Sequence, residues 1–111
     1  MAELLGTFEQ IVLVAVLRQG EDAYGRSILR AVEEAFEGSR TIAAGAVYST
    51  LDRLEVKGLL ASRLAEGTAD RGGRKRRFYR MTANGLRALN EARSMLESLW
   101  KSIRWPVEVR L

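Results

Sequence analysis

The chain has 111 residues, 47% of them hydrophobic, which is enough for one compact core and too few for two ordinary domains. It contains neither cysteine nor histidine, so disulfides and cysteine-ligated metals are excluded, and the commonest general base and metal ligand are missing. The formal net charge is +4, no apolar run approaches the roughly 18 residues of a membrane span, and Glu3 and Glu9 stand where a signal peptide is basic. We therefore expect a cytoplasmic protein that has no cofactor, no metal site and no membrane association.

Two amphipathic helices are predicted at the start of the chain. Over residues 2–19, apolar side chains recur at spacings of three and four, and Gly20 is placed to end the helix. Asp22 is then placed as the N-cap of a second helix that runs through Phe36. The dipeptide Gly38-Ser39 ends this second helix.

A third helix is predicted over residues 43–57, and Gly58 ends it. Val47, Leu51 and Leu54 lie on one face of this helix, which we expect to pack on the core. The opposite face is mixed and mostly polar. It presents Gly45, Tyr48, Ser49, Asp52 and Arg53.

Beyond Gly58 the apolar pattern changes from a helical period to a period of two. Residues 59–64 alternate as a short strand, residues 66–73 form a turn rich in glycine and small residues, and residues 74–81 form a second strand. The pattern therefore predicts a β-hairpin that follows the third helix.

The positive charge of the chain is concentrated in this hairpin. Six cations lie between residues 71 and 80 with no acid among them, and without these six the net charge of +4 becomes −2. Such a patch on a mildly acidic body is typical of a site for a polyanion. A solvated charge run in a loop is the alternative, which the adjacent Phe78 and Tyr79 disfavour, because disordered basic tails rarely contain such aromatics. The six cations are Arg71, Arg74, Lys75, Arg76, Arg77 and Arg80.

The last predicted element is a long helix over residues 83–103 that Thr82 caps. Leu89, Leu96 and Ile103 recur at intervals of seven, with other apolar residues offset between them. A helix of about 21 residues is about 31 Å long, so we expect it to pack against a second copy of the chain. Folding back entirely onto its own core is the alternative. The expected dimer interface consists of Leu89, Ala92, Leu96, Leu99, Trp100 and Ile103.

This order of elements predicts a mainly α fold with a small β-hairpin: a winged helix-turn-helix followed by a dimerisation helix. We expect residues 1–82 to form the DNA-binding domain, residues 83–105 the dimerisation helix and residues 106–111 a short tail. The third helix fits a major groove about 12 Å wide, while the hairpin reaches the neighbouring backbone. The predicted partner is therefore double-stranded DNA.

The predicted DNA contacts come from the third helix and from the tip of the hairpin. Small residues at the start of that helix let its backbone approach DNA, and the positive end of its dipole faces phosphates. Arg53 suits guanine or phosphate, or else pairs with Asp52 or Glu55, and Lys57 is a weaker phosphate candidate. The predicted contact residues are Thr41, Ala43, Ala44, Tyr48, Ser49, Arg53, Arg71, Arg74, Lys75 and Arg76.

Three motifs occur together over most of the chain. Residues 45–60 read GAVYSTLDRLEVKGLL, Ala23-Tyr24-Gly25 precedes them, and GRKRRFYRMT at residues 73–82 follows, with Gly85 after it. This combination resembles the signature of the PadR family of transcriptional regulators, and the resemblance extends over about residues 5–99. Lys75 stands where many members have proline, and the single short C-terminal helix resembles the compact branch of the family.

The resemblance implies a homodimer that represses a promoter at a pseudo-palindromic operator and, in many members, releases it when a small molecule binds. It also implies that Tyr48 contacts the DNA backbone and that the first and last helices build the dimer interface. In compact relatives an aromatic residue of the last helix lines a cavity between subunits that takes flat hydrophobic ligands, and Trp100 matches this residue best. Packing in the dimer seam is the alternative role for Trp100, because aromatic residues are enriched at interfaces.

Two other classes of function compete with this interpretation. A winged helix that binds protein instead of DNA is the alternative, but such a module has little use for six cations in its hairpin. An enzyme is disfavoured, because the available acids are scattered, and adjacent pairs such as Glu33 and Glu34 lie about 100° apart on a helix. The sequence therefore predicts a non-enzymatic regulator with no catalytic residues.

Overall fold

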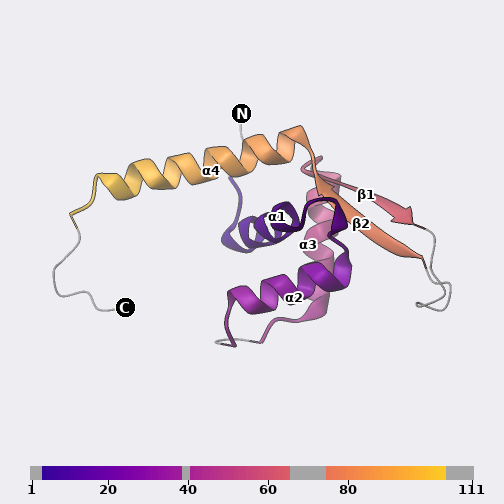
Figure 1. Ribbon diagram of the computed structural model, residues 1–111. Helices are drawn as coiled ribbons and strands as arrows, with labels where there is room; N and C mark the ends of the chain where they lie inside the picture. The colour runs from indigo at the N-terminus through magenta and orange to yellow at the C-terminus, as the bar shows by residue number, and fades with distance from the viewer. Residues whose placement is uncertain (1–3, 39–40, 66–74, 105–111) are drawn as a thin grey trace.

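Three short helices form the centre of the structure, a computed structural model that describes residues 4–38, 41–65 and 75–104. The hairpin extends from one side of these helices, and the last helix runs over the first and beyond it on the other side (Figure 1). This arrangement confirms the predicted mainly α fold with one hairpin and a long C-terminal helix. In chain order the elements are α1 (Thr7–Gln19), the 3₁₀ turn η1 (Gly20–Asp22), α2 (Gly25–Ala35), α3 (Ala44–Val56), β1 (Leu60–Ala65), β2 (Arg76–Met81) and α4 (Ala83–Lys101).

The apolar core lies between α1, α2, α3 and the start of β1. Each helix turns one stripe of aliphatic side chains inward, and burial of each leucine or isoleucine stabilises the fold by about 1.5–3 kcal/mol. The predicted inner stripe of α3, formed by Val47, Leu51 and Leu54, is confirmed. The largest fully buried side chains are Val12, Leu13, Val16, Ile28, Val32, Val47, Leu51, Leu54 and Leu60.

The first helix begins later than the sequence predicts. It starts at Thr7 with Gly6 as its N-cap, so the predicted start at residue 2 is wrong. The side chain of Glu9 turns back and accepts a hydrogen bond from Gly6 N at 3.0 Å, which satisfies a donor that a helix start leaves unpaired. Leu4 is exposed, so burial of its side chain does not favour a helical conformation at residues 4–6.

The predicted N-cap of the second helix, Asp22, is also wrong. Gly20, with φ of +66°, ends α1 as predicted, but Asp22 is the last residue of η1. The N-cap of α2 is Tyr24, whose N–H donates to Ser27 Oγ at 3.0 Å. Tyr24 is extended because its backbone forms a bridge with Phe78 of β2. A tertiary contact therefore decides where α2 begins.

The ends of α2 and α3 agree with the sequence to within a few residues. Phe36 is the C-cap of α2, and Ser39, half of the predicted stop, lies outside the described residues. The α3 helix lies within the predicted range 43–57. Gly58 follows it with φ of +78°, a left-handed conformation that favours glycine.

The hairpin is tied to the helices through its backbone. The strands β1 and β2 pair in antiparallel register along their whole length. In the described part of the chain the second strand begins at Arg76, and Lys75 does not belong to it. The predicted start at residue 74 and the predicted turn at residues 66–73 lie outside the described residues. Tyr79 N donates to Ala23 O at 2.8 Å, so the segment before α2 lies alongside β2 as a short third edge.

Hydrogen bonds around Thr82 join the end of α3 to the start of α4. The Thr82 hydroxyl donates to Gly58 O at 2.6 Å and accepts from Gly85 N at 2.9 Å, which confirms Thr82 as the predicted N-cap. Thr82 N donates to Leu59 O at 3.2 Å. Gly85 is buried so closely that a Cβ on it would lie 2.1 Å from the Leu59 carbonyl oxygen.

Beyond this junction α4 is largely exposed. The structure describes all of α4, and Gly85 is its one buried residue. The helix ends at Lys101, so Ile103, the predicted last residue, follows it, and the tail at residues 106–111 lies outside the described ranges. Among the helices described, none combines the length and apolar character that crossing a bilayer requires. The large apolar side chains exposed on or just after α4 are Leu86, Met95, Leu96, Leu99, Trp100 and Ile103.

Candidate nucleic-acid interface

The outer face of α3 is the first part of the candidate interface. The buried stripe of this helix faces the core, and the opposite side is open to solvent. Ala43 is the N-cap of α3, and small side chains surround the start of the helix, where the positive end of the dipole lies. All six residues predicted on this segment are exposed: Thr41, Ala43, Ala44, Tyr48, Ser49 and Arg53.

Tyr48 is held on this face by α2. The residue is 41% exposed, and its ring packs on Gly25, the first residue of α2. A Cβ on Gly25 would lie 2.8 Å from Tyr48 Cε1, closer than a real contact. The structure therefore gives a physical reason for the Ala23-Tyr24-Gly25 motif: the glycine leaves room for a ring that reaches across from α3.

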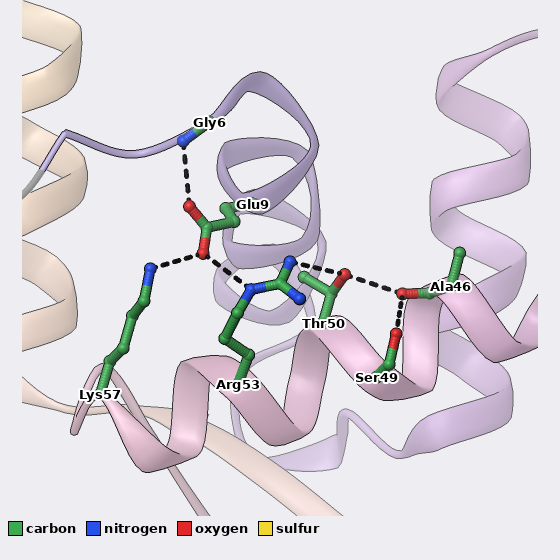
Figure 2. Close-up of polar contacts among 7 residues, drawn as sticks. All are labelled: Gly6, Glu9, Ala46, Ser49, Thr50, Arg53 and Lys57. Atoms are coloured by element: carbon green, nitrogen blue, oxygen red, sulfur yellow. Dashed lines mark hydrogen bonds and ion pairs between the residues drawn. The ribbon is translucent and has the colours of Figure 1, made fainter.

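Arg53 is bound by an acid of another helix, and not by the neighbouring acids of α3 that the sequence suggested. Arg53 Nε lies 3.4 Å from Glu9 Oε2, and Arg53 Nη2 donates to Thr50 Oγ1 at 3.3 Å. Lys57 Nζ donates to the same Glu9 oxygen at 2.8 Å. Figure 2 shows Glu9 of α1 between Arg53 of α3 and Lys57, the C-cap of that helix. We call Glu9, Arg53 and Lys57 the α1–α3 charge cluster.

Glu9 lies on the inner face of its helix and is 8% exposed. At 100° per residue it shares the apolar stripe of Val12, Leu13 and Val16. An acid inside such a stripe requires partners, because burial of an unpaired charge is strongly unfavourable. Glu9 was not predicted to lie on the buried face of the first helix. Its spacing from Val12, Leu13 and Val16 nevertheless places it there and so indicates that it has a cation partner.

The charge cluster keeps Glu9 ionised. Burial raises the pKa of the Glu9 carboxyl, but the hydrogen bonds from Lys57, Gly6 and Arg53 outweigh this effect and hold the pKa below its ordinary value. A carboxyl whose pKa is lowered by folding stabilises the native state above the ordinary pKa, and this stabilisation is lost as the pH falls through the lowered pKa.

Glu9→Gln is therefore expected to lower the free energy of unfolding at pH 7 by about 1–2 kcal/mol, the contribution typical of charged hydrogen bonds with partly exposed partners. The two proteins are expected to approach each other in stability as the pH falls below the ordinary pKa of glutamate, and to converge once the pH has fallen through the lowered pKa of Glu9. Urea unfolding at pH 7 and at a series of lower pH values measures this change. A difference between the two proteins that does not change with pH would contradict the assignment.

The second part of the candidate interface is the basic hairpin, where arginines stack on aromatic rings. The Arg76 guanidinium carbon lies 3.8 Å from the centre of the Tyr24 ring, and that of Arg63 lies 4.9 Å from the centre of the Phe78 ring. The two rings meet edge to face at 5.8 Å. Stacking orients a guanidinium while leaving its N–H groups at the rim available to an anion. Lys75 is exposed, whereas Arg71 and Arg74 lie outside the described residues.

The hairpin is also coupled to α3. Arg77 Nη1 donates to Ser62 Oγ at 2.9 Å, and Ser62 Oγ donates to Glu55 Oε2 at 2.6 Å. Burial raises the pKa of Tyr79, and the nearby Asp52 carboxylate acts in the same direction, so its phenol stays neutral. The hairpin is thus fixed against the helix whose outer face it flanks.

A separate apolar groove of about 510 Å³ lies between α1 and α4. Trp100, the residue predicted to meet an effector, lines it together with Leu89 and Leu96 of the predicted dimer seam. Ala92 is half-buried, and Leu99 and Ile103 are exposed without lining the groove. The α1 wall of the groove is formed by Gln10, Val14 and Leu17.

Comparison with known proteins matches this chain to a family of regulators. The family model described as the transcriptional regulator PadR-like family matches residues 13–91. Transcriptional regulator YqjI of Escherichia coli (strain K12) is 28% identical over 95 residues, which are 86% of this chain and 42% of that protein. The chain thus spans less than half the length of this relative.

Solved structures share the same arrangement of elements. The X-ray structure of a PadR-like transcription factor from Bacteroides fragilis is 25% identical, with a TM-score of 0.73 over 87% of this chain and 86% of that one. PadR of Bacillus subtilis, solved in complex with operator DNA, has a TM-score of 0.63 over 96% of this chain and 53% of that one. At 19% identity this second likeness shows the fold alone.

Proposed function

Because the chain belongs to the PadR-like family of transcriptional regulators, we propose that it represses a promoter as a homodimer bound to a pseudo-palindromic operator. The family consists of transcriptional regulators and not of enzymes. The observation that carries the proposal is the two-sided α3: one stripe fully buried, the other face exposed and followed by a hairpin rich in arginine. A structural relative solved with operator DNA gives further support.

In this proposal α3 enters the major groove and the hairpin meets the adjacent backbone. Tyr48 contacts the DNA backbone, and the small residues at the start of α3 allow close approach. Phosphates bind to the cations of the hairpin tip. The contacting residues are Thr41, Ala43, Ala44, Tyr48, Ser49, Arg53, Arg71, Arg74, Lys75 and Arg76.

The proposed dimer forms through α4. A single chain leaves a row of leucines and a tryptophan of α4 exposed, together with Val14 and Leu17 of α1. An apolar surface of this kind along a helix of about 28 Å is typical of an interface. Residues 1–82 are then the DNA-binding domain, 83–105 the dimerisation helix and 106–111 a tail.

In the proposed dimer, the groove between α1 and α4 becomes part of a cavity between the two subunits, and this cavity is the proposed effector site. Its apolar walls and the ring of Trp100 suit a flat hydrophobic molecule. A molecule bound there contacts both the dimerisation helix and α1. Its binding can therefore change the distance between the two α3 helices of a dimer. Packing of Trp100 against the partner chain is the competing role for this residue.

Selection of bound fragments from the source genome at near-physiological salt tests the proposal, with Tyr48→Ala as a matched variant. The wild type is expected to enrich a pseudo-palindrome whose half-sites lie about one helical turn, or a multiple of it, apart. Tyr48→Ala is expected to lose this enrichment while keeping its circular dichroism spectrum. Recovery of unselected sequence only, with binding that disappears as salt is added, would instead favour the protein-interaction module.

A further inference from the structure

We propose that Glu9 is a specificity-determining residue that withholds Arg53 and Lys57 from non-specific DNA. The inference rests on the proposed DNA-binding function of α3 and adds to it a residue that never reaches the DNA. Its basis is the α1–α3 charge cluster, in which one buried carboxylate of α1 holds two cations, Arg53 of α3 and Lys57 at the C-cap of that helix.

The geometry shows that both cations are engaged by the protein itself. Lys57 is the more strongly held, with Nζ at 2.8 Å from Glu9 Oε2 and a side chain 22% exposed. Arg53 is half-exposed, and its guanidinium is bound by Glu9 through Nε and by Thr50 through Nη2. Thr50 in turn donates to Ala46 O at 2.7 Å, which holds its hydroxyl in place. Glu9 itself is fixed by Gly6 N (Figure 2).

The charges of the cluster sum to +1 instead of the +2 that Arg53 and Lys57 would carry alone. Non-specific DNA binding comes almost entirely from cations that meet phosphates and release counterions. A cation that stays with a buried carboxylate contributes little to this term. The cluster lies at the edge of α3, the helix that is proposed to contact the bases. It therefore reduces the electrostatic attraction of this part of the protein to random DNA.

Operator DNA is expected to be affected less than random DNA. On operator DNA, base contacts hold α3 in one register. In that register the half-exposed Arg53 can still donate its remaining N–H groups to a phosphate, while Glu9 binds its Nε. Glu9 thus raises the ratio of operator affinity to random affinity, and we expect its loss to lower that ratio.

Glu9→Gln tests this, because it removes the charge and keeps the shape and the acceptor for Gly6 N. We expect random-DNA affinity to rise about fivefold for each cation released at about 0.15 M salt, and the salt slope to steepen by about 0.9 for each one. Operator affinity is expected to rise less. Glu33→Gln, an exposed glutamate of α2, makes the same change in net charge and controls for it. An effect of Glu9→Gln equal to that of Glu33→Gln would overturn the proposal.

Lys57→Met completes a double-mutant cycle. In the wild type it is expected to leave the salt slope unchanged, because Glu9 already holds Lys57, whereas in Glu9→Gln it reverses part of the gain. A slope reduced by about 0.9 in the wild type would overturn the proposal, and this arm holds even if Glu9→Gln does not fold. If the wild type binds neither operator DNA nor random DNA, the proposed DNA-binding function is wrong. This outcome is observed before any variant is made, so it is distinguishable from a failure of the proposal about Glu9.

Discussion

Gly85→Ala is expected to lower the free energy of unfolding by about 3 kcal/mol, an effect at the upper end of those caused by overpacking. The added Cβ would lie 2.1 Å from the Leu59 carbonyl oxygen. Because this neighbour is backbone, relief requires the start of α4 to move away from the turn after α3. That movement also weakens the hydrogen bonds by which Thr82 joins Gly58 and Leu59.

Gly45→Ala provides the matched control with the opposite expected sign. Gly45 lies inside α3, and a Cβ there would meet nothing within 4 Å. Alanine in an exposed helix is favoured over glycine by about 0.5–1 kcal/mol. Chemical denaturation of both variants at neutral pH distinguishes the two cases. Equal stability of Gly85→Ala and wild type would mean that α4 does not rest on Leu59 as described.

Much of the DNA-binding fold could be predicted because its signals are local. The inner stripe of α3 is a simple helical period, Gly58 ends that helix in a left-handed conformation, and Thr82 caps α4 with its own hydroxyl. Each of these features depends on residues a few positions apart. A reading of spacing and capping is therefore enough to place them.

The features that could not be predicted from the sequence depend on contacts between segments that are far apart along the chain. Tyr24 replaces Asp22 as the N-cap of α2 because its backbone meets Phe78 of β2, far along the chain. Arg53 pairs with Glu9 and not with its neighbours, because α1 crosses α3 at that point. Spacing along one helix says nothing about which helix crosses it, so neither contact was predictable from local pattern.

The partners of the charged side chains in the hairpin could not be predicted from the sequence. The hairpin was correctly placed as basic, but Arg76 proves to be stacked on Tyr24, and Arg77 to be bonded to Ser62. An arginine has a long, flexible side chain with several hydrogen-bond donors. The sequence therefore shows that an arginine is present, but it does not show where its guanidinium group lies. The sequence therefore could not show that these two guanidinium groups have partners within the protein.

Leu96→Glu is expected to convert the proposed dimer into a monomer while leaving the fold of each chain intact. Leu96 lines the groove beside α1 and is 45% exposed in the single chain, so a glutamate there keeps access to water. In a two-fold dimer the substitution occurs twice. It removes about 1.5–3 kcal/mol of apolar burial per copy and places two like charges in the interface.

The loss of the dimer is expected to lower operator affinity by roughly a hundredfold or more, because a monomer engages one half-site and each 1.4 kcal/mol is tenfold in affinity. Light scattering after size exclusion measures the mass, and circular dichroism checks the fold. Ser94→Glu adds the same charge to an exposed position about 160° away around α4 and is expected to remain dimeric. If both variants stay dimeric with wild-type operator affinity, α4 is not the interface and its apolar face has another partner. If the wild type is itself a monomer at micromolar concentration, the structure gives no reason to expect a pseudo-palindromic operator. In that case α3 would bind single half-sites.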